Sequence, residues 1–402
     1  MRVAVIGAGV VGVLSAYYLR QLNCEVTVYE RDPTAGSGTS FANGGQLSYS
    51  FTDAMADPQL LARLPGILAN RDPAFQITPS FSRSFLTWGL SFMRNCTPRR
   101  RDENTRTLVR LALRSQTLME TFATRYAPAF SLNRAGKLVL LDQPPNTELL
   151  RRVALKQAMG VDLRVVTREE IDSLEPSIRA WSQPPEAGLY SVSDAVADSL
   201  TFTRALARDL QQQEVQCWFG NPVLALQQIP DIGWQVVSQD HTETYDAVLL
   251  CTGAAAAPLL APLGIRVPVL PMAGYSVTLP RTVRSPAVSI TALAQRTVFS
   301  PLGEQIRIAG FADINPGATQ CRQRINNMLD TCRQLAPEAA DYSAQEQSGW
   351  MGYRPMTPNS LPIVGPTQHQ GLFTNLGHGM LGWTLAAATG EQIAAQISSG
   401  QH

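Results

Sequence analysis

The chain opens with an apolar stretch, MRVAVIGAGVVGVLSAYYLRQLNCEVTVYE, that three glycines interrupt. These glycines break the continuous apolar run that a secretion signal needs, and no A-x-A-like cleavage site follows them. Three polar residues, Arg20, Gln21 and Asn23, come too early for a membrane-spanning helix of about 20 apolar residues. The pattern therefore predicts a buried strand at residues 2–6, a tight turn at GAGVVG, and a helix at residues 13–22.

The turn has the spacing G-x-G-x-x-G, which is typical of sites that bind the pyrophosphate of a dinucleotide. Gly7 permits the sharp bend, Gly9 lets the pyrophosphate approach the backbone, and Gly12 lets the helix pack against the strand. The helix N-terminus carries roughly half a positive charge and faces the phosphates. Glu30 follows a second strand, at residues 25–29, and sits where a carboxylate accepts hydrogen bonds from a ribose diol. The alternative is a glycine-rich turn in an ordinary core strand, and the well-placed acid favours the nucleotide site.

Composition excludes several other classes of protein. A chain of 402 residues is long enough for two or three lobes. Its net charge of +1 gives no general attraction for nucleic acid. The six cysteines show no C-x-x-C spacing, which indicates reduced cytoplasmic thiols, and the four histidines show no i, i+4 pair, so we expect no metal site.

Hydrophobic periodicity predicts the elements that follow Glu30. The Gly-, Ser- and Asn-rich residues 31–50 are expected to form a long loop beside the nucleotide site. Helices are expected at residues 105–126, 168–174, 199–213, 326–335 and 385–397. Strands are expected at residues 137–141, 215–219, 221–229, 234–237, 245–250, 266–279, 298–308 and 371–376.

Later motifs give the chain a specific resemblance. The first turn, the strand AVLLCTG and the turn NLGHGMLGWT together resemble the FAD-dependent D-amino-acid oxidase superfamily. More narrowly, SFANGGQLS, MAGYSVTLP, GYRPMTPNSLPIVG and NLGHGMLGWT are similar to the catalytic (small) subunits of bacterial D-amino-acid dehydrogenases. The resemblance implies an α/β fold with a Rossmann-like FAD-binding domain of the glutathione-reductase type. It also implies an α+β substrate-binding domain with a mixed, largely antiparallel sheet. The FAD-binding domain would comprise residues 1–50, 190–260 and 345–402, and the substrate-binding domain residues 51–189 and 261–344.

The resemblance also implies where FAD binds. The loop residues would wrap the pyrophosphate, ribityl chain and flavin edge, Val223 would pair its backbone with adenine, and amides of the last turn would face the negative charge of the reduced flavin. No cysteine lies in the last turn, so we expect a non-covalent flavin. Two alternatives stay open: TSFANGGQ as an ordinary Asx-type loop, and His378 as a structural residue. The implied contacts are Gly7, Gly9, Val10, Val11, Gly12, Glu30, Arg31, Ser40, Ala42, Asn43, Gly44, Gly45, Gln46, Leu47, Val223, Cys251, Thr252, Gly253, Gly377, His378, Gly379, Met380, Leu381, Gly382, Trp383 and Thr384.

Two residues are the expected substrate contacts. Arg354 lies beside a proline-stiffened turn, and its planar guanidinium matches a carboxylate. In the family the matching arginine holds the carboxylate of the amino acid, and the residue that matches Tyr275 turns its hydroxyl to the same group. The alternatives are a salt-bridged surface arginine and a tyrosine that only packs.

The resemblance implies oxidative deamination of a D-amino acid to a 2-oxo acid and ammonia, by hydride transfer to flavin N5. Electrons would pass to a quinone or another respiratory acceptor. Three alternatives stay open: a D-hydroxyproline or D-proline dehydrogenase, an oxygen-using oxidase of glycine or sarcosine type, and a flavin subunit of a larger electron-transfer complex.

Residues 85–101 combine apolar side chains with Arg94 and Arg99–Arg101. This pattern fits a core helix with a basic end. It also fits a segment through which a cytoplasmic protein contacts the inner membrane.

Overall fold

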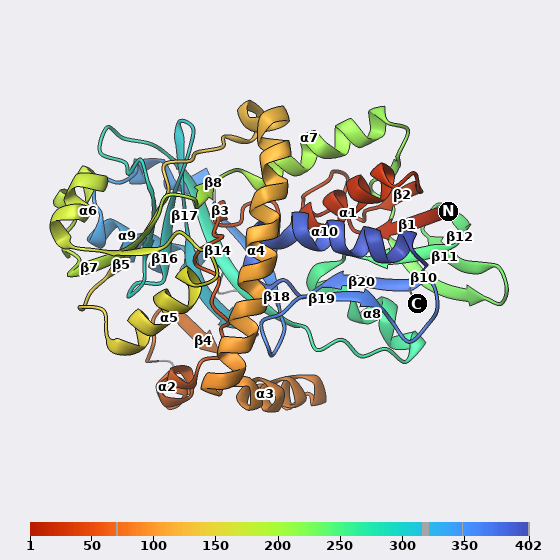
Figure 1. The fold of residues 1–402 in the computed structure, drawn as a ribbon, viewed down its shortest axis with the longest axis horizontal. Helices are drawn as coiled ribbons and strands as arrows, with labels where there is room; N and C mark the ends of the chain where they lie inside the picture. The colour runs from red at the N-terminus through yellow and green to blue at the C-terminus, as the bar shows by residue number, and fades with distance from the viewer. Residues whose placement is uncertain (70, 316–320, 348, 401–402) are drawn as a thin grey trace.

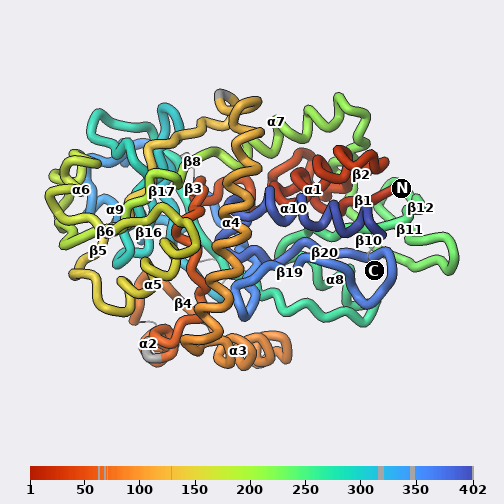
Figure 2. Tube along the Cα trace, viewed as in Figure 1, coloured from red at the N-terminus to blue at the C-terminus, as the bar shows by residue number. Residues whose placement is uncertain are grey.

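The computed structural model describes residues 1–69, 71–315, 321–347 and 349–400. Two β-sheets lie in opposite halves of the molecule, and the long helix α4 (Pro98–Tyr126) runs between the halves (Figure 1). Both ends of the described chain lie in the same half, as the red and blue segments of the tube show (Figure 2). The predicted combination of a Rossmann-like domain with an α+β domain is confirmed.

The first half is built on a six-stranded sheet in the order β19-β20-β13-β1-β2-β9. Its neighbouring strands run parallel except for the edge strand β19. Both faces are covered, which explains why the central strands are almost wholly apolar. The strands are β1 (Arg2–Ile6), β2 (Glu25–Tyr29), β9 (Gln216–Trp218), β13 (Ala247–Leu250), β19 (Ile363–Pro366) and β20 (Leu372–Leu376).

Helices pack on one face of this sheet and a small antiparallel sheet packs on the other. The helical side consists of α1 (Val10–Gln21), α7 (Ser199–Gln212) and α10 (Gly382–Ser398), with α4 packed against the same core. The opposite face carries β10 (Val223–Ile229), β11 (Gly233–Ser238), β12 (Thr242–Tyr245) and the short helix α8 (Ala257–Leu260). Parallel strands place their carboxyl ends at one edge, which is where α/β sheets bind nucleotides.

The second half is built on a nine-stranded sheet in the order β18-β14-β17-β16-β15-β5-β7-β6, with β4 paired to the end of β17. All neighbours are antiparallel except β15 with β5 and β17 with β4, so the expected mixed, largely antiparallel sheet is confirmed. The strands are β4 (Phe75–Ile77), β5 (Lys137–Leu141), β6 (Arg164–Val166), β7 (Ala187–Ser191), β14 (Leu270–Pro280), β15 (Ser289–Ala292), β16 (Thr297–Leu302), β17 (Gln305–Ile314) and β18 (Trp350–Met356).

Several helices surround the second sheet. Helix α9 (Cys321–Leu335) packs its apolar residues on one face, and α2 (Pro58–Leu68) and α3 (Arg83–Asn95) pack near the end of β14. Helices α5 (Thr147–Gln157) and α6 (Arg168–Leu174) lie beyond β5 and β7. A two-stranded ribbon, β3 (Gln46–Leu47) with β8 (Ala195–Val196), joins the two halves.

Helix and strand limits differ from the sequence expectation at a few places. Helix α4 begins at Pro98, ahead of the expected residue 105, because Thr97 caps it and proline suits the first helical position. The expected strand at residues 298–308 is a hairpin that turns at Gly303, whose φ is +60°. Strands β9 and β10, expected as a pair, belong to different sheets. Strand β18 pairs with β14 in the second sheet, although the sequence-based boundary at residue 345 assigns it to the first domain.

Candidate active site

The first glycine turn has the geometry that its spacing predicts. Gly7 has a φ of +106°, and a Cβ atom there would lie 2.8 Å from the carbonyl oxygen of Cys251. A Cβ atom at Gly12 would overlap the carbonyl oxygen of Gly7, so only glycine lets α1 pack this close to the turn. At Gly9 the nearest atom to a Cβ would be the Ser40 hydroxyl oxygen at 3.4 Å, which leaves the backbone open to a ligand.

Glu30 closes this turn. Its carboxylate accepts hydrogen bonds from the backbone N–H groups of Ala8 at 2.7 Å and Asp32 at 3.1 Å. Burial raises the pKa of this carboxyl above its ordinary value, and these two hydrogen bonds oppose the shift. The backbone of Asn221 donates to the Glu30 carbonyl at 2.9 Å, which brings the start of β10 and Val223 to the same end of the sheet. Arg31 points outward, with 64% of its side chain exposed.

The loop at residues 40–47 spans the two halves. At the first half, the N–H of Val10 donates to the Ser40 hydroxyl at 3.0 Å. At the second half, the sheet holds three successive loop carbonyls: the Ser276 hydroxyl donates to Ala42, the Arg307 guanidinium to Asn43, and the Ser300 hydroxyl to Gly44. The Asn43 side chain accepts from the N–H of Gly45 at 2.9 Å, so an Asx turn is also present.

The end of this loop is fixed to the second sheet and to helix α10. The Gln46 amide donates to the hydroxyls of Ser289 at 2.8 Å and Thr291 at 3.2 Å. Two residues later, the N–H of Ser48 donates to the hydroxyl of Thr384 at 3.0 Å in the first turn of α10. The loop and the last turn of the chain therefore meet, as the predicted cofactor site requires.

The last turn lies between β20 and α10. Gly377 has a φ of +76°, and the turn leads directly into α10 at Gly382, where N–H groups face outward from the helix end. His378 is buried and its Nε2 atom lies 3.0 Å from the Thr389 hydroxyl, while burial lowers its pKa to about 4. This contact supports the structural interpretation of His378. The indole of Trp383 donates to the Ala197 carbonyl, whereas Met380 is 56% exposed.

An unpartnered hydroxyl supports the fit of a dinucleotide to these residues. Thr252 follows β13, and its Oγ1 atom is buried without a hydrogen-bond partner among the described residues. Its backbone lies against Gly7, and Gly253 next to it has a φ of +57°. Cys251 is buried, with its thiol near the Ser15 hydroxyl, and burial raises its pKa to about 12, so it is an inert thiol. The open backbone at Gly9, the N-terminal end of α10 and the unpaired hydroxyl of Thr252 are together suited to bind FAD.

Arg354 lies on the face of the second sheet that receives this loop. Strand register pairs Arg354 with Met272 and Trp350 with Ser276, and Ser276 holds the loop, so these side chains share one face. The Arg354 guanidinium covers Gly274, where a Cβ atom would overlap it. One of its nitrogen atoms donates to the Phe311 carbonyl at 3.0 Å, and it forms no ion pair with any described residue. Burial lowers its pKa to about 10, against the opposing effects of Asp313 and Tyr275.

Tyr275 lies on the other face of the same sheet. Its partner on β18 is Met351, which lies an odd number of residues from Arg354 and therefore faces the other side of the sheet. The Tyr275 hydroxyl donates to Asp313 at 2.7 Å. Arg324 of α9 pairs with both oxygens of Asp313 at 2.7 Å. This differs from the expected arrangement, in which the Tyr275 hydroxyl faces the same carboxylate as Arg354. The reason is strand alternation, which directs neighbouring positions of opposite phase to opposite faces.

Sequence reasoning missed three residues of this region. Arg307 is 6% exposed and joins Asn43 to Asp198 and Thr278, so it holds the loop in place. Asp313 and Arg324 form a buried pair under the sheet. For Arg307 and Asp313 the available signal was a charged residue inside the otherwise apolar strand β17, since buried charges are almost always paired.

Comparison with known proteins agrees with this geometry. The family model described as FAD dependent oxidoreductase matches residues 2–396. The chain therefore belongs to the family of FAD-dependent oxidoreductases, and it is an enzyme whose cofactor is FAD.

Within that family, the resemblance to D-amino-acid dehydrogenases is confirmed. The chain is 33% identical to D-amino acid dehydrogenase 2 of Ralstonia nicotianae, over 99% of this chain and 96% of that one. It is 34% identical to D-amino acid dehydrogenase of Dechloromonas aromatica, over 99% and 97% of the two chains. Among solved structures, glycine oxidase from Geobacillus kaustophilus has a TM-score of 0.76 at 21% identity, covering 100% of this chain and 95% of that one. L-proline dehydrogenase from P. horikoshii has a TM-score of 0.77 at 20% identity, covering 100% and 94%.

Proposed function

We propose that this enzyme oxidises a D-amino acid to a 2-oxo acid and ammonia and passes the electrons to a quinone. The observation that carries the proposal is Arg354, a largely desolvated guanidinium without a carboxylate partner on the cofactor side of the sheet. A partly buried cation is more stable when an anion joins it, and a planar guanidinium pairs best with a carboxylate. The names of the relatives, D-amino acid dehydrogenases, agree with an amino acid as the source of that carboxylate.

The residues of the chain divide the task between binding and orientation. Arg354 holds the carboxylate of the substrate. Gly274 and Gly352 have no side chains, so Arg354 and Trp350 lie directly against the sheet. This arrangement directs the α-carbon of the substrate toward the loop at residues 40–47. Bound FAD supplies a hydride acceptor at its N5 atom. The α C–H bond breaks with its electron pair, the amine nitrogen forms the C=N bond and loses a proton, and water hydrolyses the imine. The backbone amides at Gly377–Thr384 offer positive potential on the flavin side.

The test is anaerobic bleaching of the visible flavin spectrum with a panel of D- and L-amino acids. We expect D-amino acids to bleach the absorption and their L-enantiomers to leave it unchanged. Bleaching by L-amino acids alone, or by none of the panel, would contradict the proposal. Extending the panel to D-proline and D-hydroxyproline tests the cyclic substrates.

The acceptor is tested separately by turnover in air. We expect substrate loss with a quinone or dye and little hydrogen peroxide. Peroxide formed at the rate of substrate loss would assign the enzyme to the oxygen-using oxidases. Turnover by the purified chain with an artificial acceptor would argue against a need for a partner subunit.

Helix α3 is the surface that we propose for contact with a membrane. Trp88 packs inward and donates its indole N–H to the Met356 carbonyl, so part of the helix is core. Three outward residues of the helix are nevertheless apolar side chains that are roughly half exposed, Leu86, Leu90 and Met93, and Phe81 just before the helix is almost fully exposed. Arg94, Arg99 and Arg100 lie beside them and suit anionic lipid. No helix in the described part of the chain combines the length and apolar character needed to cross a bilayer. Salt-sensitive pelleting with anionic liposomes would support the contact, and failure to pellet at low salt would contradict it.

A further inference from the structure

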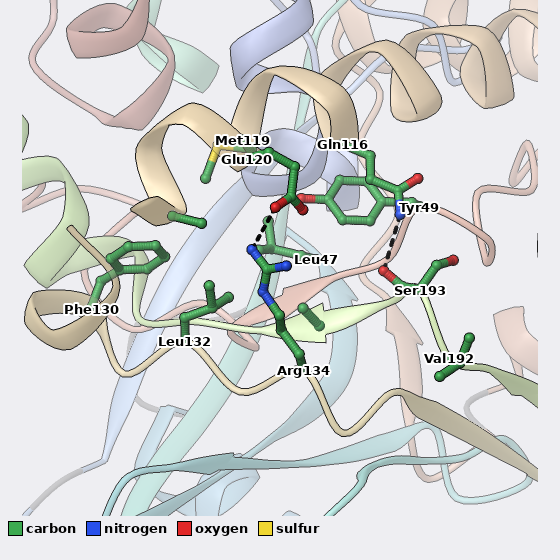
Figure 3. Close-up of a pocket in the computed structure, with 12 residues that line it drawn as sticks. Leu47, Tyr49, Gln116, Met119, Glu120, Phe130, Leu132, Arg134, Val192 and Ser193 are labelled. Atoms are coloured by element: carbon green, nitrogen blue, oxygen red, sulfur yellow. Dashed lines mark hydrogen bonds and ion pairs between the residues drawn. The ribbon is translucent and has the colours of Figure 1, made fainter. Parts of the chain in front are cut away.

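A recess of about 160 Å³ opens beside the loop that the cofactor requires (Figure 3). Helix α4 forms one wall, and the segments at residues 130–134 and 192–195 form the others. The lining is mixed: its apolar residues are Leu47, Met119, Ala123, Phe130, Leu132, Val192 and Ala195, and its polar residues are Tyr49, Gln116, Glu120, Arg134 and Ser193. This volume suits one small ring, since pockets for drug-sized ligands are commonly 300 Å³ or more, as an order of magnitude.

The recess shares a strand with the predicted cofactor site. In β3, Gln46 turns its side chain toward Ser289 and Thr291 of the second sheet, whereas Leu47 turns the other way and lines the recess. The next residue, Ser48, is bonded to Thr384 in the first turn of α10. Leu47 is therefore the residue at the end of the loop at residues 40–47 that contacts the recess.

Two polar groups in the recess are free or easily freed. Tyr49 is 4% exposed, and its hydroxyl makes no hydrogen bond with any described residue. Burial raises its pKa, with the nearby charges of Asp194 and Glu120 acting in the same direction, so the hydroxyl keeps its proton and can donate. Arg134 pairs with Glu120 at 2.7 Å, but both side chains are more than half exposed, and such pairs are worth at most about 1 kcal/mol. Figure 3 shows Arg134 and Glu120 facing each other across the recess.

We propose that this recess binds the ring of the quinone that reoxidises the enzyme. The apolar side chains of the recess can flank a flat carbon ring, and among its polar side chains Tyr49 and Arg134 present donors to the ring's carbonyl oxygens, which are acceptors only. The inference rests on the proposed function for the source of electrons. The quinone takes up two electrons and one proton from the reduced flavin and a second proton from water, and it leaves as a hydroquinone while the flavin returns to its oxidised form.

The experiment measures reoxidation without any amino acid. The holoenzyme is reduced photochemically under anaerobic conditions and mixed with a soluble benzoquinone that carries one short isoprenoid tail, and the return of flavin absorption is followed. Tyr49→Phe removes one donor and should raise the quinone concentration for half-maximal rate about fivefold. Leu132→Trp fills the recess and should abolish saturation by the quinone. Val283→Trp, at a fully exposed position that does not line the recess, is the matched control and should behave as wild type.

Binding is also measured without turnover, as the rise in melting temperature of the oxidised holoenzyme with quinone concentration. We expect Tyr49→Phe and Leu132→Trp to reduce this rise and Val283→Trp to keep it. Wild-type reoxidation and wild-type thermal shifts in Tyr49→Phe and Leu132→Trp would overturn the inference, and Tyr49→Phe alone decides if Leu132→Trp does not fold. A normal quinone response in an enzyme that no amino acid bleaches would instead count against the proposed function.

Discussion

The turn after β1 and the strand pair β14–β18 perform comparable tasks by different means. In the turn, a few consecutive residues hold a helix and a strand together, and Gly7 and Gly12 act through their missing side chains. In the strand pair, residues far apart in sequence meet because of register, and Arg354 lies over Gly274 for that reason. The difference teaches that a local site depends on backbone geometry, whereas a site across strands depends on which face each residue takes.

The largest expected effect is at the turn, in Gly12→Ala. Its new Cβ atom would overlap the Gly7 carbonyl, which neither backbone can avoid, so α1 must move away from the pyrophosphate position. Overpacking of this kind costs about 1 to 3 kcal/mol, and we expect FAD binding to weaken about 100-fold. Gly38→Ala is the matched control, because no atom lies within 4 Å of a Cβ there. Equal FAD dissociation constants for the two variants would break the comparison.

The next effect is at the strand pair, in Arg354→Ala. Loss of the guanidinium leaves a substrate carboxylate unpaired, and we expect kcat/KM to fall about 100-fold with FAD binding unchanged. Arg284→Ala, which removes a surface arginine with 59% of its side chain exposed, should have little effect. Steady-state kinetics and flavin titration distinguish the outcomes. A kcat/KM in Arg354→Ala close to wild type would refute the assignment.

A third test concerns stability at the last turn. His378 is buried with a pKa of about 4, below its ordinary value of 6.5, because burial penalises its charged form. As the pH falls, this histidine therefore gains its proton in the unfolded chain before it does so in the folded one. The free energy of unfolding decreases by about 3 kcal/mol between pH 6.5 and pH 4. Denaturant unfolding at several pH values measures the free energy of unfolding as a function of pH. His378→Asn should reduce the slope of that dependence, and the control His241→Asn, at an exposed position, should keep it. An unchanged slope in His378→Asn would contradict the cause.

The smallest effect is expected for Tyr275→Phe. The hydroxyl donates to Asp313, which keeps both hydrogen bonds from Arg324, so we expect about 1 kcal/mol less stability and a KM within about twofold of wild type. Denaturant unfolding and steady-state kinetics measure the two quantities. A KM rise as large as that of Arg354→Ala would instead show that Tyr275 binds the carboxylate, and the contrast between the two faces of β14 would fail.

Local patterns predicted much of the fold. The strands Arg2–Ile6 and Glu25–Tyr29 and the helix Arg168–Leu174 have the expected limits, because each has a clear boundary in the sequence. Thr167 caps the last of these, and Glu170 completes its capping box. The start of α4 was missed because its first turns are polar on nearly all sides and show no apolar period.

The site was predictable to a different degree. The motif glycines lie in one turn and Glu30 follows the next strand of the same strand-turn-helix-strand unit, so their spacing alone indicates their task. The role of Arg307 depends on the loop carbonyl of Asn43 arriving from another domain, and the pairing of Asp313 with Arg324 depends on how α9 packs. Neither contact can be predicted from the spacing of residues in the sequence.

The amino-acid sequence by itself determined the nucleotide turn with its flanking strands and helix, a part of the later strands and helices, and the presence of an unusual arginine at position 354. Only the tertiary structure decided that Arg354 shares a face with the loop at residues 40–47 while Tyr275 lies on the opposite face with Asp313. The physical reason is that turns are set by the conformational freedom of neighbouring residues. The face that a strand residue takes is set by pairing with distant strands, where a shift of one position reverses every side chain.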